Sequence, residues 1–279
     1  LIKCFFIFYI FLILFWIDVY PNIIQLPYDY INDTFSNINK LGWYYNLING
    51  TYYISFEVPN TYLLINLLYK SPEYILLSYF LFIVIILTSG NFFKNEFKFF
   101  YYKLGLVLFI LLFVNFVLLI IPYPIYDGMR LFLWVLPYFC IVPALTIYYF
   151  LENINSIKSK ISLFILSLFF IYFLFNFFII TPYQYTYLNI LNGKKEFRYK
   201  KFENDYWGGS IKELIKKSNF RKDKKITFST CGVEIDIIKK YLKKAGYKKI
   251  SFLSDDKADY IIMTNRTIEW NQKLTNCFE

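Results

Sequence analysis

The chain has 279 residues, of which 57% are hydrophobic, 24% aromatic and only 18% charged, with a formal net charge of +10. This balance is typical of a membrane protein and excludes an ordinary soluble globular domain. The sequence contains no histidine, which excludes histidine general bases, histidine metal ligands and Ser-His-Asp triads. The four cysteines show no CxxC spacing, so we expect no metal site.

Five apolar segments predict membrane helices, at about 1–17, 74–93, 104–122, 131–151 and 161–181. The last four are long enough to cross a hydrocarbon core of roughly 30 Å as helices. The first is short and starts at Leu1 rather than at a methionine. We interpret it as a truncated helix, with a signal peptide as the alternative. Residues 1–181 are therefore expected to form a transmembrane domain, in which 18–72 is an outer loop.

The basic residues of the short loops predict the orientation of these helices. Lys94, Lys98 and Lys103 follow the second segment, and Lys158 and Lys160 precede the last one. Short loops rich in lysine and arginine are typical of the cytoplasmic side. The loop 18–72, the turn at 126–130 and everything after residue 181 are then expected on the outer side.

The turn at 126–130 carries two charges between two long apolar segments. Arg130 lies at the predicted outer end of a helix, where its planar guanidinium suits a phosphate at the depth of the lipid headgroups. The alternative is a capping turn, with Asp127 as N-cap, Gly128 at the bend and Arg130 reaching to the interface. The residues alone favour neither interpretation.

Residues 182–279 predict a small extracytoplasmic α/β domain. Strand-like segments at 225–232, 248–254 and 258–266 alternate with an amphipathic helix at 234–246, which indicates a partly parallel sheet. Ser210 with Glu213 predicts a capping box for one more helix. Cys231 and Cys277 could form a disulfide or remain two buried thiols.

The domain 182–279 also carries most of the net charge, with 21 basic and 12 acidic residues. Such a surface is either simply solvated or attracted to anionic headgroups or a phosphate-bearing substrate. No nucleic-acid-binding motif accompanies it, so nucleic acid is not expected as a partner.

Three linked motifs carry a resemblance to a known family. They are YDGMRLFLWVLPYF at 126–139, PYQYTYLN at 182–189 and KFENDYWGGSIKEL at 201–214, with SPEYILL at 71–77 upstream. Together they resemble the C-terminal half of bacterial GT-C-fold glycosyltransferases of the protein mannosyltransferase and aminoarabinose transferase-like superfamily.

The resemblance implies an inverting enzyme of the bacterial inner membrane that moves a sugar from a polyprenyl-phosphate donor to a glycan, lipid or protein acceptor at the outer face. For the donor phosphate we favour Arg130, because it is the only arginine before position 198 and lies at the outer end of a predicted helix, with Asp127 orienting it or binding the sugar hydroxyls. Lys70 is either a second cation for the phosphate or a side chain that reaches to the membrane interface. The family often has a histidine directly after this arginine, where this chain has Leu131. The family's catalytic acid belongs to an outer loop expected upstream of Leu1, so this fragment alone is expected to be inactive. A divalent metal could take part in the full-length protein.

A polar cluster follows the last predicted helix, and we expect it to pack the outer domain onto the membrane domain and to shape the acceptor side: Gln184, Asn189, Glu203, Asp205, Tyr206 and Trp207. One alternative function is a non-catalytic envelope protein, anchored by its helices, whose outer domain binds a partner or polymer. A transporter is disfavoured because the four full apolar segments contain no ionisable side chain except those of tyrosines and Cys140, whereas transport pathways usually need intramembrane charges.

Overall fold

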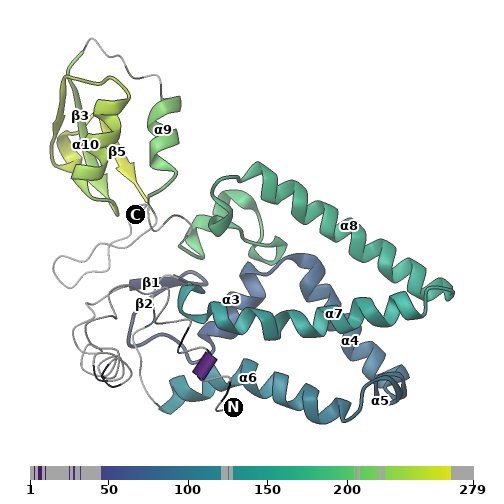
Figure 1. Ribbon diagram of the computed structural model, residues 1–279. Coiled ribbons are helices and arrows are strands. Elements are labelled where there is room, and N and C mark those ends of the chain that lie inside the picture. The colour runs from purple at the N-terminus through teal and green to yellow at the C-terminus, as the bar shows by residue number, and fades with distance from the viewer. Residues whose placement is uncertain are drawn as a thin grey trace. The chain divides into compact units, whose positions relative to one another are not determined.

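Figure 1 shows the computed structural model of the protein. It describes residues 45–120, 125, 128–203, 205, 208–218, 220 and 224–264, with the single residues 3, 6, 7, 10, 25, 28 and 32. The predicted span 1–17, apart from isolated positions, and the residues Asp127, Tyr206, Trp207 and Cys277 lie outside the described part. The chain divides into two compact units, Leu1–Trp43 and Tyr44–Glu279. All elements named from here on belong to the second unit.

Three helical segments are long and apolar enough to cross a membrane. They are α6 (Phe100–Ile120), the continuous pair of η2 (Arg130–Val135) and α7 (Leu136–Glu152), and α8 (Ile157–Ile179). They confirm the predicted helices at 104–122, 131–151 and 161–181 as candidate spans. In Figure 1, α7 packs against both α6 and α8.

The predicted helix at 74–93 is wrong as one continuous element. Helix α4 (Glu73–Ser89) ends at Gly90, and the short α5 (Asn91–Glu96) follows. A Cβ at Gly90 would lie 2.6 Å from the backbone carbonyl oxygen of Ile86 and 2.8 Å from the hydroxyl oxygen of Tyr101, so any larger residue here would force the backbone to shift. Helix α4 passes the span criterion only together with α3 (Tyr62–Lys70), and this pair is bent by 110°. The described residues thus hold three candidate spans, or four if the bent pair counts as one, and five spans are not confirmed.

Polar and aromatic contacts join α4 to α7. Thr146 Oγ1 donates a hydrogen bond of 3.0 Å to the carbonyl oxygen of Ser78. The Tyr79 hydroxyl donates one of 2.7 Å to the carbonyl of Phe139, and the two rings stack at 4.9 Å. Interhelical hydrogen bonds of this kind stabilise helix packing where water is absent.

The described part of the expected loop 18–72 contains regular structure. Strands β1 (Tyr45–Ile48) and β2 (Thr51–Ile54) form an antiparallel hairpin. Its two turn residues, Asn49 and Gly50, have φ values of 49° and 91°, as Asn-Gly in a tight hairpin turn requires. The hairpin is followed by α3 (Figure 1).

The predicted α/β region is present. After α9 (Ile211–Lys217) come β3 (Ile226–Cys231), α10 (Ile235–Lys244), β4 (Ile250–Phe252), η6 (Asp255–Lys257) and β5 (Tyr260–Met263). The strand order is β4-β3-β5 and both pairings are parallel. Its core contains Phe228, Ile238 and Leu242, all fully buried, because α10 turns its apolar positions onto β3.

The cysteines of the described part differ in state. Cys231 is disulfide-bonded, and its partner lies outside the described residues. Cys140 is a free thiol.

Candidate functional site

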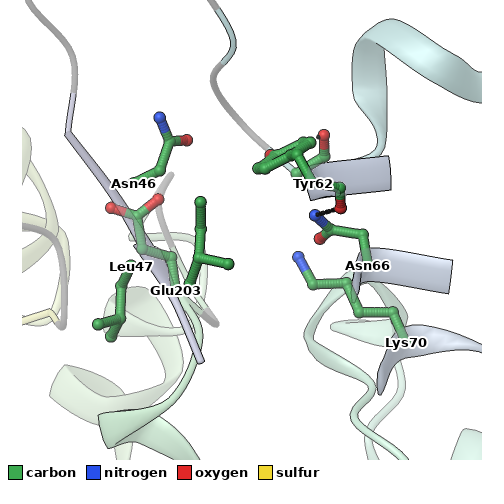
Figure 2. Close-up of a pocket in the computed structure, with 8 residues that line it drawn as sticks. Asn46, Leu47, Tyr62, Asn66, Lys70 and Glu203 are labelled. Carbon is green, nitrogen blue, oxygen red and sulfur yellow. Dashed lines mark hydrogen bonds between the residues drawn. The ribbon is translucent and has the colours of Figure 1, made fainter. Parts of the chain in front are cut away.

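A small polar cavity lies between the hairpin, α3 and the turn that precedes η2 (Figure 2). It has room for about one water molecule, at ≈ 10 Å³. Figure 2 shows Asn66 and Lys70 on one side, from α3, and Asn46 and Glu203 on the other. The complete lining is Asn46, Leu47, Ile48, Tyr62, Asn66, Lys70, Gly128 and Glu203.

One face of α3 supplies most of the polar wall. Tyr62, Asn66 and Lys70 are spaced four residues apart, so they lie on the same side of the helix. The Tyr62 hydroxyl donates a hydrogen bond of 3.0 Å to the carbonyl of Gly128. Asn66 Nδ2 donates to the carbonyl of Tyr62 at 2.9 Å. The Tyr62 bond holds α3 against the turn at Gly128, and the Asn66 bond lies within α3 itself.

The ammonium group of Lys70 meets the same turn. A Cβ added to Gly128 would lie 2.9 Å from Lys70 Nζ, and the φ of Gly128 is +65°. Glycine at position 128 therefore does two things. It allows the left-handed backbone conformation, and it leaves space for the ammonium group of Lys70. Lys70 Nζ also lies 5.6 Å from the centroid of the Phe202 ring. Glu203 is the carboxylate whose charge acts on Lys70, and no carboxylate of the described residues forms an ion pair with Lys70 within 4.0 Å.

Buried polar side chains fix the bend between α3 and α4, right beside Lys70. Asn189 Nδ2 donates to the carbonyl oxygens of Leu68 at 2.6 Å and Ser71 at 2.9 Å. Glu73 accepts from the backbone amide of Ile190 at 2.9 Å and from the Tyr187 hydroxyl at 2.6 Å. We call this set the bend cluster, and its side chains are Glu73, Tyr187, Asn189 and Asn192.

The bend cluster satisfies carbonyl groups that a helix break leaves without partners. Asn192 Nδ2 donates to the carbonyl of Tyr69 at 2.9 Å, next to Lys70 in the chain. Burial, together with the hydrogen bond to Glu73, raises the pKa of the Tyr187 hydroxyl. The segment after α8 thereby holds the end of α3 that presents Lys70.

Asp205 organises the start of α9. Its carboxylate accepts hydrogen bonds from the backbone amides of Gly209 at 2.9 Å and Ser210 at 2.8 Å, and from the hydroxyls of Ser210 and Tyr185. Burial alone would raise the pKa of this carboxyl, but the hydrogen bonds from Ser210, Tyr185 and the two amides lower it below its usual value.

The predicted capping box at Ser210 is wrong. Ser210 makes no side-chain cap hydrogen bond to α9. Its hydroxyl donates to Asp205 instead, because that carboxylate already receives the Ser210 amide and lies within reach. Asp205 thus accepts from the Ser210 amide, the bond that the box pattern gives to the side chain of Glu213.

The structure brings some of the predicted site residues together and leaves others apart. Lys70 and Glu203 share the polar cavity with Gly128, which adjoins Asp127 in the chain. Arg130 begins η2, is exposed and does not line the cavity. Asn189 lies in the bend cluster, and Gln184 is half-buried and donates a hydrogen bond of 2.8 Å to the hydroxyl of Thr181.

Sequence reasoning missed Glu73, Asn46, Tyr62 and Asn66. A signal existed for Glu73, which is a charged residue at the very start of an apolar segment. Tyr62 and Asn66 share a four-residue spacing with Lys70 that places all three on one helix face, but the stretch was interpreted as a loop. For Asn46 the sequence offered no such signal.

The described residues hold no group of three or more histidine, cysteine, aspartate or glutamate side chains that could bind a metal ion. No family model matches the chain, and no curated protein or solved structure matches it either. The helices and the sheet themselves define a largely helical protein of membrane type, with three candidate spans and a small α/β region among the described residues.

Proposed function

We propose that the protein is a glycosyltransferase of the bacterial inner membrane, which takes a sugar from a polyprenyl-phosphate donor and transfers it to an acceptor at the outer face. One observation carries the proposal. Two of the segments that resemble the GT-C family line one cavity, through Gly128 of 126–139 and Glu203 of 201–214, and Lys70 of the same cavity directly precedes the segment 71–77. The meeting of these distant segments at one polar cavity supports a common site.

In this proposal Lys70 holds the phosphate of the donor. An ammonium group offers three donors and a full charge to phosphate oxygens. The cavity of ≈ 10 Å³ has room for about one water, so donor binding would require its walls to separate. In the proposal Arg130, which begins η2 two residues after Gly128, supplies a second cation to the phosphate.

The opposite side of α3 supports a place for the lipid chain. Leu64, Leu67 and Leu68 of α3 line an apolar groove of about 300 Å³, together with leucines of α6 and with Tyr79 and Phe139. A carrier with an anionic head and an isoprenoid tail needs a cation and an apolar groove close together. Helix α3 offers both, on its two faces.

The experiment is photo-crosslinking of the protein in detergent with a benzophenone-labelled polyprenyl phosphate, with mass spectrometry of the labelled peptides. We expect labelling of peptides that contain residues 62–70 or 108–112, and competition by unlabelled polyprenyl phosphate but not by the matching polyprenol. Lys70→Met should reduce labelling about tenfold, since a charge-assisted hydrogen bond contributes about 1.5–3 kcal/mol, whereas Lys70→Arg should retain most of it. Lys94→Met, at an exposed lysine of α5, is the matched control.

The alternative is a non-catalytic envelope protein, and the small volume of the closed cavity favours it. That function predicts equal competition by polyprenol and polyprenyl phosphate, and no effect of Lys70→Met. Either result would reject the glycosyltransferase proposal. Sugar transfer from a radiolabelled polyprenyl-phosphate donor in membranes, with Lys70→Met as the comparison, then tests the chemical step itself.

A further inference from the structure

A second cavity, of about 360 Å³, lies where α9 meets the turn that follows α8. It belongs neither to the Lys70 cavity nor to the bend cluster. Its lining is one aromatic residue, three lysines and one acidic residue: Tyr183, Lys212, Glu213, Lys216 and Lys217.

The cavity is lined by more positive than negative side chains, three lysines against one glutamate. Lys217 pairs with Glu213 at 2.7 Å. Lys212 and Lys216 lie one helical turn apart on α9, both are exposed, and among the described residues no carboxylate forms an ion pair with either. Like charges at this spacing repel each other and destabilise a short helix. An anion between the two ammonium groups would relieve that repulsion.

The walls of the cavity are held in place by hydrogen bonds from both sides. Asp205 ties the amides of Gly209 and Ser210, at the start of α9, to the hydroxyl of Tyr185. The Tyr183 side chain is hydrogen-bonded to Glu213. The lysines of α9 therefore face a fixed aromatic ring rather than a mobile loop.

We propose that this cavity binds a phosphate group, with Lys212 and Lys216 as its donors and the Tyr183 ring packed against whatever carries the phosphate. Two ammonium groups one turn apart can both donate to the oxygens of one phosphate. Tyr183 follows the end of α8, at Ile179, by only a few residues, and tyrosine and lysine are typical of the membrane interface. The phosphate can belong to a lipid headgroup or to a soluble molecule. The proposal stands independently of the glycosyltransferase function.

The test is lysine footprinting. The full chain, in a detergent without phosphate, is acylated with an amine-reactive ester, and the rate at each lysine is read by mass spectrometry. Inorganic phosphate should slow the reaction at Lys212 and Lys216 and leave Lys240 and Lys243 of α10 unchanged, with chloride at equal ionic strength as the reference. Equal slowing at all four lysines means general screening and overturns the proposal.

A second arm identifies the source of the phosphate. The chain is placed in nanodiscs of phosphatidylcholine alone or with phosphatidic acid. Protection of Lys212 and Lys216 only with phosphatidic acid assigns a lipid headgroup, and protection by inorganic phosphate in detergent assigns a soluble ligand. Protection by neither source overturns the proposal.

Two double variants measure how much Lys212 and Lys216 contribute to the affinity for phosphate. Lys212→Gln with Lys216→Gln should weaken the apparent affinity for the effective phosphate source by about tenfold or more, because each charge-assisted bond is lost. The affinity of each variant for inorganic phosphate is measured by equilibrium dialysis with radiolabelled phosphate, and that for phosphatidic acid by binding to the nanodiscs. Lys240→Gln with Lys243→Gln removes the same charge from α10 and should leave the affinity unchanged. Equal affinities for the two double variants would reject the assignment of Lys212 and Lys216.

Discussion

The hydroxyl of Tyr187 donates a hydrogen bond of 2.6 Å to Glu73, which lies 114 residues earlier in the chain. This contact joins the first turn of α4 to the segment that follows α8. It belongs to the bend cluster, which fixes the end of α3 beside the cavity of Lys70.

Glu73→Ala should destabilise the protein by about 2–4 kcal/mol, because the buried Tyr187 hydroxyl and the amide of Ile190 would both lose their acceptor. Tyr187→Phe removes only one of the two bonds and should cost about 1 kcal/mol. Thermal unfolding in detergent measures both. If Glu73→Ala is no more destabilising than Tyr187→Phe, the second bond to Ile190 contributes nothing.

Asn189→Ala should cost about 2–3 kcal/mol, since it leaves the buried carbonyl groups of Leu68 and Ser71 without their donor. Asn189→Asp should cost more, because a carboxylate would face those carbonyls and cannot donate to them. Gln184→Ala is the matched control from the same predicted polar cluster. Its side chain is only half-buried and bonds to the exposed Thr181, so a change of about 0.5 kcal/mol or less is expected. Chemical unfolding of the three variants tests this order.

The stability of the wild type should depend on the charge of Asp205. The hydrogen bonds to its carboxylate lower the pKa below the usual value of 3.8. A group with a lowered folded-state pKa stabilises the fold above its unfolded-state pKa, and this contribution is lost as the pH falls through the folded-state pKa. We therefore expect the difference in unfolding temperature between wild type and Asp205→Asn to be full at pH 6 and to shrink below about pH 3.8. A difference that stays constant from pH 6 to pH 2.5 would contradict a role for the ionised form.

Gly128→Ala should destabilise the protein by two separable effects. The left-handed φ of +65° costs about 1 kcal/mol for a residue with a Cβ, and the new methyl would press on the ammonium of Lys70. The same substitution in a Lys70→Ala background should retain only the backbone cost. A double-mutant cycle measured by unfolding isolates the contact. Strict additivity of the two changes would show that Lys70 yields freely to the methyl group.

Several elements could be predicted from the sequence because a single physical cause produces them. The apolar segments that became α6, α7 and α8 need only length and hydrophobicity, and the alternation of strand and helix after residue 225 follows from side-chain periodicity. The break at Gly90 could not be predicted, since the apolar segment continues to Phe93 and a single glycine within an apolar helix does not by itself end it. An Asn-Gly pair between alternating residues does signal a hairpin, and that signal at Asn49 was missed.

The candidate site was less predictable than the fold. Lys70 and Glu203 were both named from the sequence, but their common cavity depends on the hairpin and on the bend after α3. Arg130 was expected to be the principal cation, and the structure leaves it outside the cavity. The order of residues along the chain does not show whether Lys70 or Arg130 lines the cavity. The position of Lys70 depends on the bend after α3, and Asn189 and Glu73 fix that bend through contacts between distant segments.

The hairpin turn also has a chemical consequence for the ageing of the protein. Asparagine followed by glycine is prone to deamidation, in which the glycine nitrogen attacks the asparagine side chain. The amide nitrogen of Gly50 donates a hydrogen bond of 3.0 Å to the carbonyl of Lys201, and this bond restrains the attacking atom. Asn49 should therefore survive storage while the fold is intact and convert to aspartate and isoaspartate once the chain unfolds.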